Sequence, residues 1–276
     1  MQKPTERIVS AQNALLVRVR SLTERKYRRK EGLFRFDGRK LFLEALAAKI
    51  PLVAVLLCES AADEIVAAAA DAELPEGCRA VLLPDELFAR VSEEKSPDGV
   101  ICVAKTLDKL HKIVTIDSKA APADFPESGH ILLLESVRDP GNLGTVIRSA
   151  AAFGAELLVL SADCADIYHP RAIRAAMGTL FSQYILVVED FAGAVRALAE
   201  RRRVFAAALD ESASRLGETR FLPNDAVLVG NEGHGLSPEA LSACTDTLYI
   251  PMASGVESLN AGIAASVILW ELTRGR

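Results

Sequence analysis

Short apolar runs alternate with amphipathic segments through the first hundred residues. The runs VAVLLC (53–58) and GVICVA (99–104) are typical of buried strands. Leu15, Val19 and Leu22 recur at helical spacing and predict a helix over 11–22, with Ser10 as its cap. Strands that alternate with helices indicate an α/β layer structure. Further strands are expected at 33–36 and 80–83, and further helices at 39–48, 62–72 and 84–91.

The same alternation returns after residue 130 and predicts a second α/β region. ILLL (131–134) is continuously apolar, as expected for a strand buried on both faces of a parallel sheet. The other strands are expected at 156–160, 185–188, 204–208, 227–229 and 247–250. Helices are expected at 145–153, 169–181, 191–202, around 241 and at 260–272. An open, mostly parallel sheet of this kind binds ligands outside the carboxyl ends of its strands.

The segment between the two regions has a different composition. Residues 117–128 contain Pro122 and Pro126 among small and charged residues, which is typical of a linker. The expected organisation is therefore a domain at 1–105, a linker at 106–128 and a second domain at 129–276.

Composition indicates a globular protein. Half of the 276 residues are apolar and a quarter are charged. The longest apolar stretch, 261–270, is too short to span a bilayer, and the amino terminus lacks the pattern of a signal peptide. Five scattered cysteines without a CxxC pair favour reduced thiols in a cytoplasmic protein. The four histidines are isolated, so no metal site is expected.

Charge is distributed unevenly along the chain. The net charge is −5, but residues 1–40 hold 12 Lys/Arg and 4 Asp/Glu, a local charge of +8 that leaves −13 for the remainder. Such asymmetry suggests a face for a polyanion, although a solvated helix face without a partner fits the run equally well. The candidate RNA contacts are Arg18, Arg25, Lys26, Arg28 and Arg29.

Three loops that combine glycines with hydrogen-bonding side chains follow strands of the second region. They span 135–144, 230–237 and 251–260. One such loop would pass for a tight connection, but three at strand ends favour a shared ligand pocket. The dinucleotide-binding GxGxxG motif, the P-loop and the GxSxG nucleophile elbow are all absent. The sequence therefore lacks the motifs that would support a dehydrogenase, NTPase or hydrolase function.

Three long motifs resemble the signatures of the SpoU-type (TrmH-like) RNA 2′-O-ribose methyltransferases of the SPOUT class. They are DPGNLGTVIRSAAAFG (139–154), LVGNEGHGLS (228–237) and IPMASGVESLNAGIAAS (250–266). The run RKYRRKEGLFRFDG (25–38) is similar to the start of that family's small, ribosomal-protein-like substrate-binding domain. The resemblance thus covers nearly the whole chain. It implies a deep trefoil knot in the carboxyl-terminal domain, a rare exception to unknotted topology.

The resemblance also implies the cofactor, S-adenosylmethionine, and the residues of the site. The residues that it places against the cofactor are Gly230, Asn231, Glu232, Gly235, Ile250, Pro251, Met252, Ser258 and Leu259. The residues that it assigns to catalysis are Asn142, Arg148, Glu232, Ser258 and Asn260.

Methyl transfer to a hydroxyl is an in-line displacement from a neutral leaving group, so the enzyme must orient the hydroxyl and help remove its proton. By resemblance, Arg148 activates that hydroxyl. Because a guanidinium has a pKa above ~12, binding an RNA phosphate is a less demanding alternative to a base role. His234 lies in a Gly-rich turn without a paired carboxylate, so a solvent-facing loop position is favoured over a general base.

The expected function is S-adenosylmethionine-dependent methylation of a ribose 2′-hydroxyl in structured RNA, with ribosomal RNA ahead of transfer RNA. The resemblance also implies a homodimer. Ile263, Val267 and Trp270 form one stripe of the last helix and suit either that interface or packing on the helix's own sheet. The rival interpretations are a catalytically silent RNA-binding or ribosome-assembly factor with this fold and a nucleotide-dependent α/β enzyme.

Overall fold

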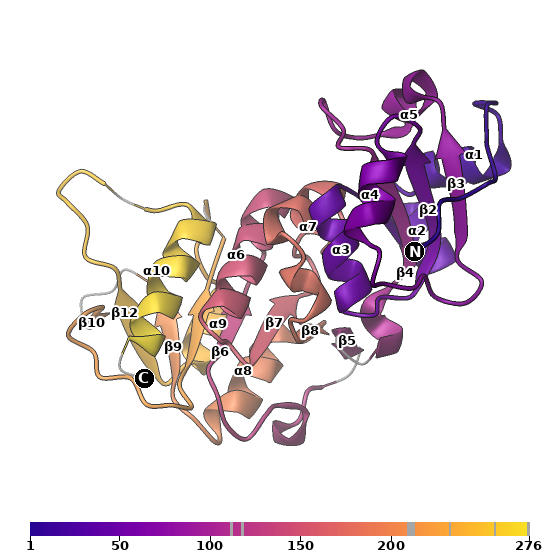
Figure 1. Cartoon of the computed structure of the whole chain (residues 1–276). Helices are drawn as coiled ribbons and strands as arrows, with labels where there is room; N and C mark the ends of the chain where they lie inside the picture. Colours follow the sequence, from indigo (N-terminus) through magenta and orange to yellow (C-terminus); the bar gives the residue numbers. More distant parts are fainter. Residues whose placement is uncertain (111–112, 117–118, 209–212, 232, 257, 275–276) are drawn as a thin grey trace. The chain divides into compact units, whose positions relative to one another are not determined.

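The computed structural model describes the chain except for residues 111–112, 117–118, 209–212, 232, 257 and 275–276. The chain divides into two compact units (Figure 1). Unit 1 comprises Met1–Lys109 and Tyr168–Phe181, and unit 2 comprises Leu110–Ile167 and Ser182–Arg276. A segment between two strands of unit 2 thus belongs to unit 1. The domain boundaries expected at 105 and 129 stay a prediction.

Unit 1 is built on a mixed four-stranded sheet with the order β1-β4-β2-β3. β4 is antiparallel to both β1 and β2, whereas β2 and β3 are parallel. The strands are β1 (Leu33–Asp37), β2 (Leu52–Cys58), β3 (Arg79–Leu83) and β4 (Val100–Lys105). The helices are α1 (Ala14–Ser21), α2 (Arg25–Glu31), α3 (Arg39–Ala47), α4 (Ala62–Ala68), α5 (Asp85–Val91), α7 (Pro170–Ala176) and the 3₁₀ turns η1 (Leu107–Leu110) and η3 (Thr179–Phe181).

Aromatic contacts explain why residues 168–181 belong to unit 1. The ring centroids of Phe34 and Tyr168 lie 4.8 Å apart, and those of Phe36 and Phe181 lie 5.4 Å apart. The Tyr168 hydroxyl accepts a hydrogen bond from the Leu107 amide, with an N···O distance of 2.7 Å. Buried aromatic pairs of this kind stabilise a contact beyond the apolar area that they cover.

Unit 2 is built on an eight-stranded sheet in which the paired strands run parallel. The strand order is β10-β12-β9-β11-β6-β7-β8-β5. Its strands are β5 (Ile113–Ile116), β6 (Ile131–Leu134), β7 (Leu157–Ser161), β8 (Ile185–Val188), β9 (Val204–Ala207), β10 (Ser214–Arg215), β11 (Ala226–Val229) and β12 (Asp246–Tyr249). Its helices are α6 (Pro140–Ala152), α8 (Phe191–Ala199), α9 (Pro238–Ala243), α10 (Ala261–Thr273) and the 3₁₀ turn η2 (Pro122–Asp124). The predicted α/β class with a largely parallel second sheet is confirmed.

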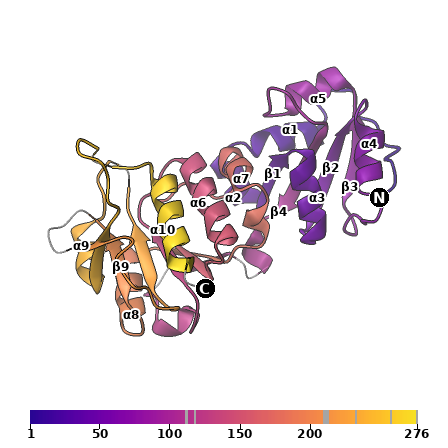
Figure 2. The same ribbon diagram turned by 60° about the vertical axis from the view of Figure 1, so that its left-hand side comes forward.

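Helices cover both faces of this sheet (Figures 1 and 2). Ile131 and Leu133 of β6 share a buried core with residues of α8 and α9. Because successive strand residues point to opposite faces, Leu132 and Leu134, which are also buried, face the side of α6 and α10. These two helices pack against each other. Burial on both faces explains the continuous apolar run of β6.

Several element boundaries differ from the expectation, and each difference has a local cause. The helix expected from residue 145 begins at Pro140, because Asp139 caps it and accepts a hydrogen bond from the Asn142 amide at 2.9 Å. The helix expected over 169–181 ends at Ala176, since Met177 and Gly178 have φ values of 50° and 81°. The first helix begins at Ala14, with Asn13 as its cap in place of Ser10.

Two strands of unit 2 were not expected. β10 is an edge strand of only two residues and pairs with β12. β5 lies within the segment expected to be a linker and pairs in parallel with β8. Short edge strands carry too few residues to produce a readable alternation. Within the described part of the chain, no helix has both the length and the apolar character needed to cross a membrane.

Candidate functional site

Helices α6 and α10 bring two predicted catalytic residues together. Asn142 lies in the first turn of α6, and Asn260 caps α10 by accepting hydrogen bonds from the Gly262 and Ile263 amides at 3.0 and 3.3 Å. The Asn260 Nδ2 atom donates to Oδ1 of Asn142 at 2.9 Å. One side chain thus joins the starts of two helices, and it orients the amide of Asn142.

Arg148, the residue expected to act on the hydroxyl, lies on α6 with an exposed side chain. Among the described residues, none forms a hydrogen bond or ion pair with its guanidinium. The group is therefore available to a ligand, and its catalytic role stays a prediction.

A cavity of about 300 Å³ opens among the loops that follow β9, β11 and β12. These strands are neighbours, so the cavity lies at the carboxyl edge of the sheet, where ligands of parallel α/β sheets bind. Its lining includes most residues predicted to contact the cofactor, namely Gly230, Asn231, Gly235, Ile250, Met252, Ser258 and Leu259. The apolar side chains among them suit an aromatic ring, and the loop amides and carbonyls suit the polar edge of that ring.

Two further cofactor assignments are not placed in the cavity. Pro251 is exposed and is absent from the lining, although its neighbours Ile250 and Met252 are part of it. Glu232, expected both in catalysis and in cofactor binding, lies outside the described residues.

Position 230 requires glycine because the backbone of Gly235 approaches it closely. A Cβ atom at this position would lie 2.5 Å from the carbonyl oxygen of Gly235 and 2.8 Å from Cδ2 of Leu236. The approach is fixed by paired backbone hydrogen bonds of 3.0 Å between Asn231 and Gly235. The loop thus closes into a narrow turn that forms one wall of the cavity.

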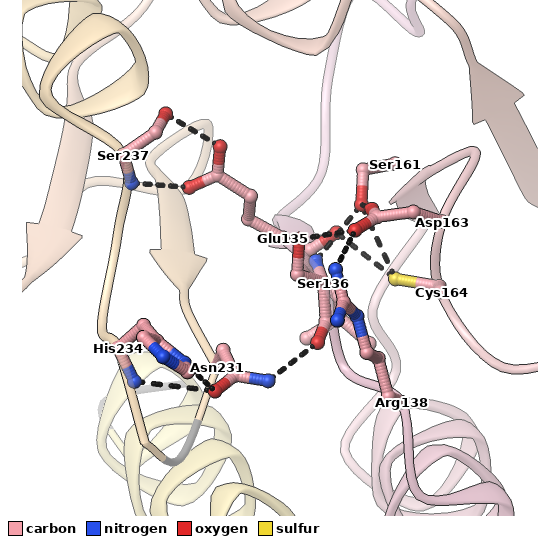
Figure 3. Close-up of polar contacts among 10 residues, drawn as sticks. Glu135, Ser136, Arg138, Ser161, Asp163, Cys164, Asn231, His234 and Ser237 are labelled. Carbon is pink, nitrogen blue, oxygen red and sulfur yellow. Dashed lines mark hydrogen bonds and ion pairs between the residues drawn. The ribbon is translucent and has the colours of Figure 1, made fainter.

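Polar side chains lock this turn to the loop after β6 (Figure 3). Both carboxylate oxygens of Glu135 accept hydrogen bonds from Ser237, one from its amide at 2.8 Å and one from its hydroxyl at 2.6 Å. Asn231 donates from Nδ2 to the Ser136 carbonyl at 2.8 Å, while its Oδ1 accepts from the Gly233 amide at 2.8 Å. The two motif loops are therefore held in one arrangement.

Ser136 has an unusual backbone. Its φ is 55°, in the left-handed region, which costs a non-glycine residue roughly 1–2 kcal/mol. Its amide donates to Oγ of Ser161 at 2.8 Å, and its hydroxyl donates to Asp163 at 2.6 Å. The serine is therefore held in this conformation by its neighbours (Figure 3).

The pKa of Asp163 is lowered from its ordinary value. Burial by itself raises this pKa, but hydrogen bonds from Ser136, Ser161 and Arg138 outweigh burial. Asp163 is therefore a carboxylate at neutral pH. Burial raises the pKa of the neighbouring Cys164 thiol, and burial also raises that of Cys244, to about 12, so both thiols stay protonated.

The predicted RNA contacts divide into exposed and buried residues. Arg25, Lys26 and Arg29 of α2 are exposed, and Arg18 is exposed beside its ion-pair partner Glu31. Assigning Arg28 to RNA was wrong. This side chain is 2% exposed and donates to the carbonyls of residues 22 and 23 at 2.8 and 2.7 Å. The guanidinium thus donates hydrogen bonds to carbonyls at the end of α1, and these bonds compensate for the burial of its charge.

Other lining residues escaped the sequence patterns. Ala207 ends β9 and Ala208 follows it, and Ala261 and Ala264 come from α10. Alanine carries no functional group, so only its place after a strand or at a helix start could have indicated a lining position. His234 is exposed, as favoured from the sequence, and its Nδ1 lies 3.4 Å from Oδ1 of Asn231.

Comparisons with known proteins agree on one family. Residues 129–270 match the SpoU rRNA Methylase family, and residues 13–102 match the MRM3-like substrate binding domain. The chain is similar to an uncharacterized tRNA/rRNA methyltransferase of Synechocystis sp., with 31% identity over 97% of this chain and 93% of that protein. It is 29% identical to the Bacillus subtilis 23S rRNA (guanosine(2553)-2′-O)-methyltransferase RlmP, over 97% of this chain and 99% of that protein. Among solved structures, the AdoMet-bound rRNA methyltransferase from Sinorhizobium meliloti superposes with a TM-score of 0.80 at 25% identity, over 98% of each chain.

Proposed function

Because this chain belongs to the SpoU rRNA methylase family, we propose that its cavity holds S-adenosylmethionine and that Asn142 and Arg148 act on a ribosomal RNA ribose. The protein is an RNA 2′-O-ribose methyltransferase. The observation that carries the assignment of the site is the convergence of the three motif loops. Those after β11 and β12 line one cavity, and the loop after β6 is hydrogen-bonded to its wall. The family also supports the expected knot.

The cavity fits the cofactor. A Cβ at Gly230 would collide with the backbone of Gly235, so this position needs glycine for the turn that forms the cavity wall to close. Ile250, Met252 and Leu259 supply the apolar walls. When bound, S-adenosylmethionine supplies an electrophilic methyl group on a sulfonium.

The residues near α6 orient the acceptor. Arg148 binds the RNA phosphate next to the target ribose, or assists removal of the hydroxyl proton, from an exposed position with no partner among the residues that the structure describes. Asn142 is oriented by Asn260 and supplies hydrogen bonds to the ribose. Ser258 lines the cavity and precedes Asn260 by two residues in the chain. Together they place the 2′-oxygen in line with the methyl group.

Methyl transfer to purified RNA tests this function. Methyl-labelled S-adenosylmethionine is incubated with unmodified ribosomal RNA and, separately, with transfer RNA, and the nucleosides are then separated. Label is expected on a ribose 2′-oxygen of ribosomal RNA. Label on a base would refute the proposed reaction. Label on transfer RNA alone would refute the proposed substrate. Cofactor binding with no transfer to either RNA would favour a silent RNA-binding factor.

The exposed cations of α2 are proposed to bind the RNA. Replacing Arg25, Lys26 and Arg29 with glutamine should weaken RNA binding and lower the slope of its salt dependence on a log–log plot by about 2–3, since each lost phosphate contact removes about 0.7–0.9. Filter binding at several salt concentrations measures this slope. A matched variant replaces three exposed cations of unit 1 outside α2, namely Lys40, Lys49 and Arg90. If both variants lower the slope equally, α2 has no special role.

A homodimer is proposed through α10. Ile263, Val267 and Trp270 are 54%, 37% and 55% exposed, so this stripe faces away from its own sheet. An exposed apolar stripe on a helix is typical of an interface. Val267→Glu should give a monomer in sedimentation experiments with an unchanged circular dichroism spectrum. Leu222→Glu, at another exposed apolar residue of unit 2, should leave the dimer intact. A wild-type monomer would end the proposal. A cytoplasmic location stays a prediction.

A further inference from the structure

Asp163 is linked by hydrogen bonds to both polar hydrogens of Ser136, directly to the hydroxyl and through Ser161 to the amide. The Ser136 hydroxyl donates to Oδ2 of Asp163 at 2.6 Å. The Ser136 amide donates to Oγ of Ser161 at 2.8 Å, and the Ser161 hydroxyl in turn donates to Oδ1 of Asp163 at 2.6 Å. Each carboxylate oxygen of Asp163 thus lies at the end of one hydrogen-bonded path that starts at Ser136 (Figure 3).

The remaining polar group of Ser136 points to the cofactor loop. Its carbonyl accepts from Nδ2 of Asn231 at 2.8 Å, and Oδ1 of Asn231 accepts from the Gly233 and His234 amides at 2.8 and 3.2 Å. Asn231 lines the cavity. A continuous chain of hydrogen bonds therefore runs from Asp163, after β7, to the cavity wall, after β11.

The left-handed backbone of Ser136 makes this series of hydrogen bonds depend on Asp163. With φ at 55°, the peptide is held in a conformation that an L-residue leaves readily when its contacts are lost. Rotation of that peptide would carry the carbonyl away from Asn231. Hydrogen bonds to an ionised acceptor are stronger than neutral ones, so the carboxylate is well suited to hold the serine.

The Arg138 contact with Asp163 is secondary. Their side chains are 70% and 46% exposed, and the shortest distance between guanidinium and carboxylate is 3.1 Å. Solvent screens such a pair. The two serine hydroxyls are therefore the contacts through which Asp163 acts.

From these contacts we propose that Asp163 is a positioning residue for cofactor binding, which acts through the left-handed backbone of Ser136 on the Asn231 loop. The inference rests on the proposed assignment of the cavity to S-adenosylmethionine. It gives a role to a polar turn that the sequence motifs leave unassigned.

Calorimetric titration with S-adenosylmethionine tests this role. Asp163→Ala should weaken cofactor binding about tenfold, as expected when hydrogen bonds to a charged group are lost. Asp163→Asn keeps an acceptor oxygen and should give a smaller loss. Glu200→Gln, at an exposed acid of the same unit, should bind like the wild type. Thermal unfolding without cofactor checks that each variant is folded.

A second background separates positioning from a general structural effect. Glycine adopts positive φ without strain, so Ser136→Gly should keep the carbonyl in place without help from the carboxylate. In that background, Asp163→Ala should weaken binding by about twofold or less. An equal loss in both backgrounds, or no loss in either, would overturn the inference. If the wild type binds no S-adenosylmethionine, the proposed site itself fails; normal wild-type binding with an unchanged Asp163→Ala overturns the inference alone.

Discussion

Replacing Arg148 with alanine is expected to lower the methyl-transfer rate about 10²- to 10⁴-fold, the range typical of losing a residue that assists proton transfer in the transition state. Cofactor affinity should change little, because Arg148 does not line the cavity. Stability should change by less than about 0.5 kcal/mol, because the side chain is exposed and has no partner among the described residues.

Single-turnover rates with saturating cofactor measure the first effect, and calorimetry measures the second. Arg196→Ala is the matched control, since Arg196 is an exposed helical arginine of the same unit on α8. Loss of cofactor binding together with activity would make Arg148 a structural residue and contradict the proposed role.

Arg148→Lys distinguishes the two roles considered for this side chain. Lysine keeps the charge but cannot form the two parallel hydrogen bonds of a guanidinium. Partial activity, restored by higher RNA concentration, is expected if Arg148 binds a phosphate. A rate as low as that of Arg148→Ala at saturating RNA would instead indicate that the guanidinium itself takes part in activating the hydroxyl.

Gly230→Ala should abolish most cofactor binding. The added methyl group would lie 2.5 Å from a backbone oxygen of Gly235, and backbone cannot move aside as a flexible side chain can. Overpacking of this kind costs about 1–3 kcal/mol or more, which corresponds to about 5- to 150-fold weaker binding if the loop shifts to relieve it.

The same loop offers a matched control. At Gly233, a Cβ would be 3.5 Å from Oδ1 of Asn231, an ordinary contact. Gly233→Ala should therefore bind S-adenosylmethionine within about threefold of the wild type, less than 1 kcal/mol. Calorimetry with thermal unfolding compares the two variants. Equal affinities would mean that the narrow turn does not shape the cofactor site.

Most elements were predictable, and the failures were local. β6 and β8 were placed at their observed bounds, because a continuous apolar run between turns has few alternatives. The start of α6 was misplaced because its glycines suggested a loop, whereas the Asp139 cap and Pro140 begin a helix. The edge strand β5 has only four residues, of which Val114 and Thr115 are exposed, so its pattern was weak.

The sequence by itself determined the family and the cofactor class. The three motifs are long, contiguous runs, so they can be recognised without knowing what lies near them. It also predicted which loops would meet, because parallel strands bring their carboxyl ends to one edge.

Only the tertiary structure decided which side chains are available. Arg28 differs from its exposed neighbours Arg25 and Arg29 only by its position on the inner face of α2, where its charge is used by carbonyls at the end of α1. The stripe of Val267 and Trp270 could have faced the sheet, yet it is exposed. Asp163 reaches Ser136 across 27 residues of chain. Burial and such contacts depend on residues that are distant in sequence, so no local pattern records them.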